Sequence, residues 1–153
     1  MSVRLSEDEI WDFLAQGHTG IFTSLRRDGF PVALPVWYVA LDRRIYLSGP
    51  AQTKKFARVR RDDRVSFLVE SGKAWKELKA VHLNGRARVV EDPEEQAGAQ
   101  KALDAKYAAF RTRQSAMPKA TRGHYVSAGS TMLCIEPEGR VLSWDNKKIG
   151  LRA

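Results

Sequence analysis

The residues best suited to chemistry stand where a strand-like run meets a basic, helix-like run. The first run ends at Ser48, and Gly49-Pro50-Ala51-Gln52 breaks the strand pattern after it. Thr53, Lys54 and Lys55 then begin the basic run. Because a helix N-terminus presents free backbone N–H groups and the positive end of its dipole, these hydroxyl and ammonium groups predict a phosphate site. A solvated helix start with an ordinary threonine cap has the same pattern, so both interpretations stay open.

A second candidate is a strand-like run that contains Pro35, Trp37 and Tyr38. Proline lacks a backbone donor, so the run must lie at a sheet edge or contain a bulge. The backbone groups freed in this way would be able to contact a planar heterocycle lying along the strand. Two core aromatic residues at a bulge give the same pattern, and the residues alone leave that alternative open.

Signals for hydrolytic or metal chemistry are missing from the sequence. His18, His82 and His124 are far apart and lack metal-ligand spacing. Cys134 is the single cysteine and stands in an apolar run, which indicates an inert core thiol and excludes a disulfide within the chain. No nucleophile-elbow, P-loop or dinucleotide-binding motif occurs. Chemistry at this protein would therefore be carried by a bound cofactor that the chain orients.

The composition indicates one folded domain over residues 1–153 with a basic surface. The net charge is +8, and basic residues are densest between Lys54 and Arg64, which favours an anionic partner. No helix-turn-helix or aromatic–basic RNA motif occurs, so we expect no nucleic-acid partner. No apolar run is long enough for a membrane span, and the first residues do not resemble a signal peptide, so we expect a cytoplasmic protein without a membrane partner.

The elements that must position these residues are mostly strands joined by short turns. A capping box of Ser6 and Glu9 begins the first helix and Gly17 ends it, and Asp92 caps a later helix that should run to about Arg113. A helix is also expected at 54–61 and a loop at 114–127. Strands are expected at 20–25, 31–40, 44–48, 64–70, 80–90 and 131–136, the first three as a meander, and 140–144 should continue the last one. This order predicts a mainly β, α+β fold with a closed or nearly closed antiparallel barrel.

Five runs in this order and spacing resemble the pyridoxamine 5′-phosphate oxidase-like superfamily. They are GIFTSLRRDG at 20–29, PVALPVW at 31–37, IYLS at 45–48, TKKFARVRRDDRV at 53–65 and VHLNGRARV at 81–89. The resemblance is closest to the branch of deazaflavin-dependent reductases that use coenzyme F420. The ending Ser143-Trp144-Asp145 is similar to that of some members.

The resemblance implies a six-stranded antiparallel split β-barrel of the FMN-binding type, assembled as a homodimer with two cofactor sites at the interface. It implies that Pro35, Val36 and Trp37 run along the cofactor ring. It further implies that the phosphate is held by Ser48, Thr53, Lys54 and Lys55. Trp75, Lys76 and Lys79 would reach the partner's ligand. Arg58 stands where the family's helix commonly has asparagine, so its role is open.

The implied function is an oxidoreductase that transfers a hydride between reduced coenzyme F420 and a small conjugated substrate. The basic surface favours this coenzyme because it carries an anionic oligoglutamate tail. The alternatives are an FMN-dependent oxidoreductase and a non-catalytic flavin-, deazaflavin- or haem-binding protein on the same barrel. The catalytic residues are unknown, and Tyr38 and His82 are candidates for a proton donor.

Overall fold

The computed structural model describes residues 2–127 and 129–150. Four α-helices lie within this part of the chain: α1 (Glu7–Gln16), α2 (Lys54–Arg61), α3 (Pro93–Tyr107) and α4 (Lys119–Ser127). The strands are β1 (Gly20–Leu25), β2 (Pro31–Val36), β3 (Val39–Leu41), β4 (Arg44–Pro50), β5 (Arg64–Ser71), β6 (Lys79–Val89), β7 (Ser130–Pro137) and β8 (Leu142–Asp145). None of the described helices is long and apolar enough to span a membrane.

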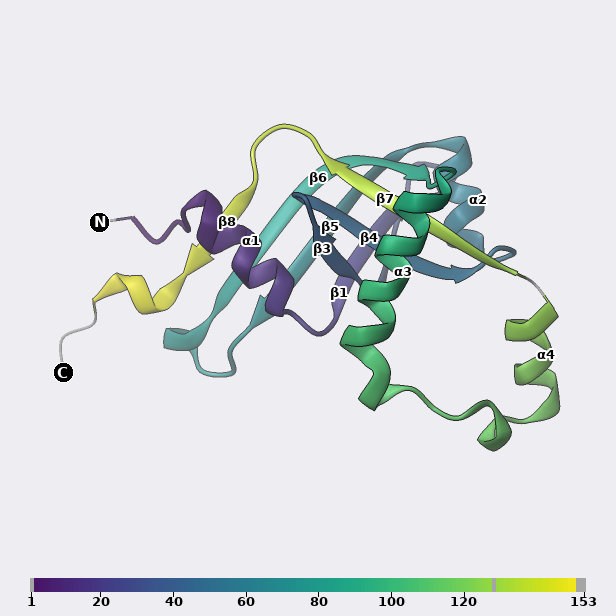
Figure 1. Ribbon diagram of the computed structural model, residues 1–153. Helices are drawn as coiled ribbons and strands as arrows, with labels where there is room; N and C mark the ends of the chain where they lie inside the picture. The colour runs from purple at the N-terminus through teal and green to yellow at the C-terminus, as the bar shows by residue number, and fades with distance from the viewer. Residues whose placement is uncertain (1, 128, 151–153) are drawn as a thin grey trace.

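All strands belong to one antiparallel sheet with the order β2-β1-β5-β6-β7-β4-β3 (Figure 1). The long strand β6 pairs with β5 along one edge. Its other edge is shared, because residues 85–89 pair with β7 and residues 79–82 pair with β8. The expected alternation along β6 is confirmed: Val81 and Leu83 are buried, whereas Asn84 and Arg86 are exposed.

The two ends of this sheet are consecutive in the chain. Only Trp37 and Tyr38 separate β2 from β3, although these strands stand at opposite ends of the strand order. The sheet must therefore curl until its end strands meet at this corner, which makes it a half-barrel. The predicted mainly β architecture is thus confirmed, with eight strands in the described residues where six were expected.

Two of the sequence-based strand assignments were wrong. The run 31–40 breaks at the corner into β2 and β3, so 20–48 is not a meander: β4 pairs with β3 and β7. Residues 142–145 do not continue β7 but pair with β6. Pro35 does lie in an edge strand, as the missing donor required, because β2 ends the strand order.

The helices at the C-terminal half also differ from expectation. The helix α3 ends at Tyr107 rather than Arg113, and a 3-10 turn follows at Ala108–Phe110. The expected loop at 114–127 contains a 3-10 turn and α4. Periodicity could not predict α4, because its sequence KATRGHYVS is mostly small or polar and carries a central glycine.

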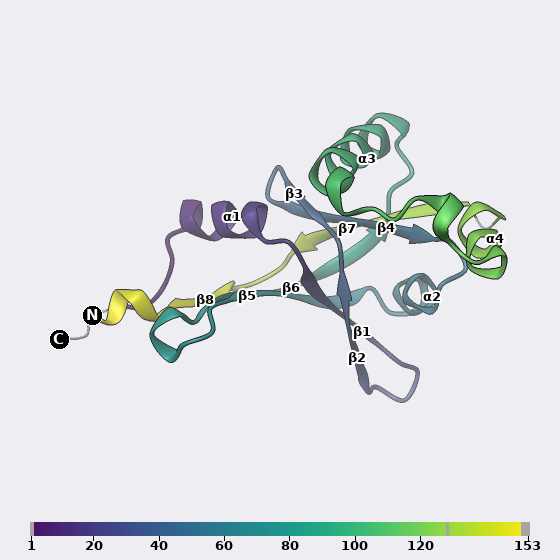
Figure 2. The same cartoon turned by 90° about the horizontal axis from the view of Figure 1, so that it is seen from below.

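The core lies inside the curl, between the sheet and the helices. Figure 2 shows α1 and α3 on the same side of β5, β6 and β8. Leu14 of α1 and Phe56 of α2 are fully buried against the inner face of the sheet. A second cluster under α3 contains Leu103, Tyr107 and Cys134, and Cys134 is a buried thiol as expected. Burial raises the pKa of this thiol, which agrees with an inert core residue.

Hydrogen bonds to Tyr107 hold the corner between β2 and β3. The Tyr107 hydroxyl accepts the backbone N–H of Tyr38 at 2.9 Å and lies 2.7 Å from the carbonyl oxygen of His18. It lies 2.8 Å from the carbonyl oxygen of Tyr38, to which the Lys106 amine also donates. The phenol of Tyr38 in turn donates to the carbonyl oxygen of Leu14 in α1. One side chain of α3 therefore connects the end of α1 with the corner.

Segments near the two ends of the chain lie side by side. The backbone N–H of Asp145 donates to the carbonyl oxygen of Val3 at 2.8 Å, and the N–H of Leu5 donates to the Ser143 hydroxyl. The predicted capping box of α1 is present, and its glutamate, Glu9, pairs with Lys148 at 2.7 Å. The hydrogen bond from Lys148 lowers the pKa of this carboxyl to about 2. The first helix is thus tied to residues near the other end of the chain.

The corner predicts a stability change for Tyr107→Phe. The substitution keeps the ring but leaves the buried N–H of Tyr38 without its partner, which costs about 1–3 kcal/mol of unfolding free energy. Urea unfolding measures this loss. Tyr46→Phe is the matched control, because the Tyr46 hydroxyl donates to Glu95, whose carboxylate keeps Arg88 as a partner. A loss for Tyr107→Phe no larger than that of the control would contradict the role of this hydroxyl.

Candidate functional site

A cavity of about 670 Å³ opens where the end of β4 meets the start of α2. Its volume is in the range of small-molecule sites. Its sheet side is formed by the end of β4, by Ser130 of β7 and by Trp37 from the corner, and Lys55 reaches it from α2. Its remaining walls come from α3 and from the chain between α3 and β7, which Figure 1 shows looping away from the sheet. Of the nine predicted binding residues, Trp37, Ser48 and Lys55 line this cavity.

Lys55 gives the cavity an unbalanced positive charge. Its amine has no hydrogen bond or ion pair to any described residue, and it lies 5.3 Å from the centre of the Phe56 ring. Burial lowers the pKa of this amine, because leaving water disfavours the charged form. No acidic residue stands in the first turn of α2. An anion next to the amine would offset the free-energy cost of burying this charge. It would also interact favourably with the positive end of the α2 dipole.

Gly49 makes room for this amine. A Cβ atom at position 49 would lie 3.0 Å from the Lys55 Nζ and 3.3 Å from its Cε. These distances are shorter than ordinary contacts, so a side chain there would push the lysine aside. The glycine at position 49 thus has a steric role, because it leaves space for the Lys55 amine at the cavity.

Thr53 and Lys54 are placed differently from the prediction. Thr53 stands at the N-cap of α2, but its side chain makes no capping bond, and its Oγ1 is buried without a partner among the described residues. Lys54 is exposed and lines a separate groove of about 360 Å³ beside the turn between β1 and β2. The four predicted phosphate ligands are therefore divided: Ser48 and Lys55 line the cavity, whereas Thr53 and Lys54 do not.

The groove around Lys54 is strongly basic. Its cationic members are Arg26, Arg27, Lys54, Arg58 and Arg61. The single acidic residue in its lining, Asp28, pairs with Arg26 at 2.8 Å. Arg58 thus faces a cationic groove between α2 and the hairpin, where a basic side chain suits an anionic ligand.

Aromatic residues form the other end of the cavity. Trp37 stacks on Tyr107 with ring centroids 4.5 Å apart and an interplanar angle of 3°. Phe110 lies beyond them, with His18 edge-on to it at 4.5 Å. Sequence reasoning missed Tyr107 and Phe110, although two aromatic residues three positions apart at the end of a largely polar helix were a usable signal.

Pro35, Val36 and Tyr38 do not line the cavity. Pro35 is exposed on β2 opposite Ile21, and Val36 packs against the core. Tyr38 is fully buried, and burial strongly raises the pKa of its phenol, which already donates to a backbone carbonyl. Tyr38 is therefore a core residue in this structure and not an available proton donor.

Trp75 and Lys79 lie near the junction of β6 and β8, and they do not line the cavity. Trp75 is exposed in a 3-10 turn that also contains Lys76. The Lys79 amine lies 3.8 Å from Asp145 and 4.9 Å from the centre of the Phe13 ring. Their expected contact with a partner's ligand involves a second chain and stays a prediction.

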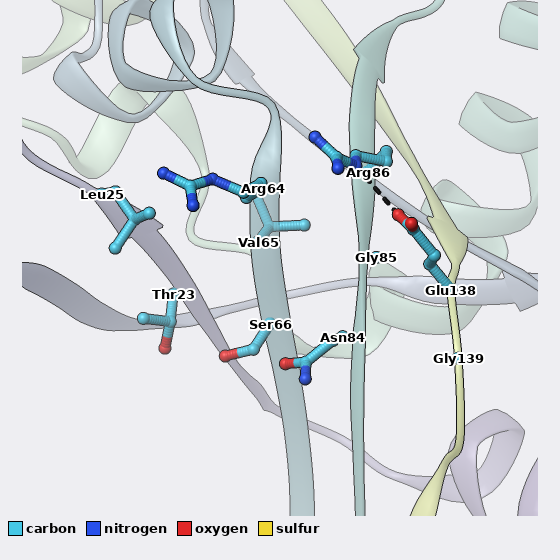
Figure 3. A pocket seen from close by; sticks show the side chains of 10 residues that line it. All are labelled: Thr23, Leu25, Arg64, Val65, Ser66, Asn84, Gly85, Arg86, Glu138 and Gly139. Carbon is cyan, nitrogen blue, oxygen red and sulfur yellow. Dashed lines mark hydrogen bonds and ion pairs between the residues drawn. The ribbon is translucent and has the colours of Figure 1, made fainter. Parts of the chain in front are cut away.

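A shallower hollow of about 530 Å³ lies on the outer face of β1, β5 and β6 (Figure 3). Thr23, Ser66 and Asn84 are register neighbours across these three strands and share this face. The Arg86 guanidinium pairs with Glu138 at 2.8 Å and with Asp63 at 2.8 Å. Because its charges are paired, this face suits a contact surface better than an anion site. Within the described residues no cluster of His, Cys, Asp or Glu is placed to hold a metal ion.

The fold and the cavity define a curled antiparallel β protein with a small-molecule site that favours an anionic ligand. The sequence pattern of the pyridoxamine 5′-phosphate oxidase family matches residues 6–138, and the chain belongs to that family. The predicted superfamily is thereby confirmed. No curated protein matches the sequence.

Solved structures support the same assignment. A conserved hypothetical protein from Mycobacterium tuberculosis is 30% identical, with a TM-score of 0.81 over 100% of this chain and 93% of its own. A FAD-binding protein from Mesorhizobium loti is 21% identical, with a TM-score of 0.68 over 91% of this chain and 93% of its own. The haem storage protein HutZ from Vibrio cholerae is 13% identical, with a TM-score of 0.69 over 94% of this chain and 96% of its own. The last two show a shared fold.

The two neighbouring lysines allow a matched test of the anion cradle. Lys55→Ala removes a charge-assisted contact worth about 1.5–3 kcal/mol, so the dissociation constant for FMN should rise about 10- to 100-fold. Lys54→Ala, one residue away but outside the cavity, should change it less than threefold. Fluorescence titration measures both constants. Equal effects of the two substitutions would show that the cavity at Lys55 is not the phosphate site.

Proposed function

We propose that this protein is an oxidoreductase that uses a flavin-type cofactor, specifically reduced coenzyme F420, to reduce a small conjugated substrate. The observation that carries the proposal is the desolvated Lys55 amine, which lacks a described partner and shares one cavity with an aromatic wall. Membership of the pyridoxamine 5′-phosphate oxidase family supports redox chemistry. Fold neighbours described as FAD-binding proteins support a flavin-type ligand.

The residues of the cavity divide the work of binding. Ser48, Lys55 and the N-terminus of α2 would hold the cofactor phosphate, with hydroxyl, ammonium and backbone donors. The cofactor ring would extend along β2 from Pro35 and Val36 and would reach the edge of Trp37. When bound, the reduced cofactor supplies a hydride equivalent.

The remaining walls exclude water and offer no dedicated acid. Leu103 and Met117 line the cavity with apolar surface. The Tyr107 hydroxyl is occupied by the backbone of the corner, and the Arg111 guanidinium pairs with Asp104 at 3.0 Å. No carboxyl or imidazole group is present in the described lining. We therefore propose that solvent supplies the proton that accompanies the hydride.

The basic groove on the other side of the start of α2 favours the deazaflavin over FMN. Lys54 and Lys55 are consecutive, so the groove and the phosphate cradle adjoin the same helix start. Coenzyme F420 continues beyond its phosphate into an oligoglutamate tail, and FMN ends at the phosphate. We propose that the tail lies in the groove, next to Arg58 and Arg61.

Salt and groove substitutions test the choice of cofactor. Exposed charge pairs are screened over about 8–10 Å near physiological ionic strength, so F420 affinity should fall more steeply with salt than FMN affinity. At low salt F420 should bind at least as tightly as FMN. The double substitution Arg58→Ala, Arg61→Ala should weaken F420 about three- to tenfold and leave FMN unchanged.

Arg60→Ala is the control for the groove, because Arg60 is exposed on the same helix but does not line it. Copurification of stoichiometric FMN that supports turnover of an enone or quinone, with no binding of F420, would overturn the choice of F420. A haem absorption band in the purified protein, with neither flavin nor deazaflavin binding, would overturn the oxidoreductase itself.

We also propose that the protein works as a homodimer joined through the outer face of β1, β5 and β6. Figure 2 shows α1 and α3 on the other side of β5 and β6, and the outer face carries neither. Large apolar side chains are exposed beside it on β8, where Leu142 is 51% and Trp144 is 39% exposed. A partner on this face would cover them, and Trp75 and Lys79 would then be available to the partner's cavity.

The dimer predicts a molecular mass of about twice 17.2 kDa by light scattering at micromolar concentration. Ser66→Glu places an unpaired charge at the centre of the outer face and should shift the protein to monomers. Ala15→Glu adds the same charge at an exposed position of α1, on the other side of the sheet, and should not. A wild-type monomer that binds cofactor would contradict both the interface and the shared site.

A further inference from the structure

The cavity lining contains two chemically different groups of residues, which we call its anion end, at Ser48 and Lys55, and its aromatic end, at Trp37 and the residues from α3 onward. Lys55 is the cation of the anion end. At the other end the single charged side chain in the lining is Arg111, which Asp104 neutralises at 3.0 Å. That end therefore attracts neither anions nor cations strongly. Its polar groups without charge, Thr112 and Gln114, are suited to hydrogen bonds with a neutral ligand.

One wall of the aromatic end is fixed. Trp37 stacks in parallel on Tyr107, and the Tyr107 hydroxyl is held by the backbone of His18 and Tyr38. Tyr107 is fully buried, whereas Trp37 remains 36% exposed at the cavity. An exposed indole face held in one orientation is a stacking surface for another flat ring.

The chain that follows α3 adds two more residues to this part of the lining. Phe110 ends a 3-10 turn and is 59% exposed, so a large aromatic side chain faces solvent beside the cavity. Met117 follows another 3-10 turn, and its unbranched side chain adjusts to ligands of different outline. Both residues belong to the chain between α3 and α4, which Figure 1 shows away from the sheet.

We propose that this aromatic end is a separate subsite for a flat, uncharged aromatic ring that carries a hydroxyl or carbonyl substituent. Its walls are Trp37, Leu103, Tyr107, Phe110 and Met117. Naming this ring as the hydride acceptor rests on the proposed function. The binding of the ring itself does not, because it follows from the aromatic surfaces and the neutral lining.

The test measures equilibrium binding of two probes to the purified full-length chain by calorimetry. 2-Naphthol is flat, aromatic and neutral, and decahydro-2-naphthol has the same skeleton without the flat ring. The flat probe should bind at least about tenfold more tightly, and Phe110→Ala should remove about tenfold of its affinity. The exposure of Phe110 makes this substitution compatible with folding.

Two variants serve as matched controls. Phe30→Ala removes an equally exposed phenylalanine beside the β1–β2 turn, and it should leave 2-naphthol binding unchanged within twofold. Lys55→Ala should likewise leave 2-naphthol binding unchanged within twofold, because Lys55 belongs to the anion end of the cavity. Equal binding of both probes, or a loss with Lys55→Ala as large as with Phe110→Ala, would overturn the subsite.

The outcomes separate this subsite from the proposed function. If 2-naphthol shows the expected pattern while neither FMN nor F420 binds, the subsite stands and the oxidoreductase fails. If a cofactor binds through Lys55 while the flat probe is not distinguished from the saturated one, the oxidoreductase stands and the subsite fails.

Discussion

The two-residue connection between β2 and β3 is the constraint on which the rest of this structure depends. A sheet whose end strands are joined by Trp37 and Tyr38 alone has to curl, and curling creates the inside that the core fills. The same connection divides its two aromatic residues between two environments. Tyr38 turns inward and is fully buried, whereas Trp37 turns toward the cavity. Tyr107 secures both, because its hydroxyl binds the backbone of the corner and its ring supports the indole. The packing of Tyr107 therefore determines both how the sheet curls and how Trp37 is presented to the cavity.

The charges of this basic protein fall into two groups. Many are satisfied within the fold: Arg88 pairs with Glu95 at 2.6 Å, and Arg86 bridges Asp63 and Glu138. Such pairs connect strands and helices. Because their charges cancel, they produce only a weak electrostatic potential to attract a ligand. Lys55 and the groove around Lys54 are different, because the described residues nearby supply almost no counter-charge. The net charge of +8 thus matters less than the places where it is left unbalanced.

Local signals in the sequence were sufficient for the local features of the fold. The capping box at Ser6, the N-cap at Asp92 and the alternation along β6 all depend on residues within a few positions of one another. The break at Trp37 and the pairing of β8 with β6 depend on contacts between distant segments, which no local pattern encodes. The site shows the same division. Ser48 and Lys55 were predictable from a strand–turn–helix pattern, whereas Tyr107 ends α3 and Phe110 lies in the turn after it, more than fifty positions further along.

The contact between the two ends of the chain has a consequence for folding during synthesis. The helix α1 is synthesised before the sheet, yet some of its contacts involve residues that are synthesised after the sheet: Lys148 pairs with Glu9, and the backbone of Asp145 binds Val3. Because domains acquire structure as the nascent chain emerges, the sheet from β1 to β7 has the opportunity to curl before these partners exist. The helix α1 would then complete its docking only after translation has passed residue 148, so an element that is synthesised before the sheet would settle after it.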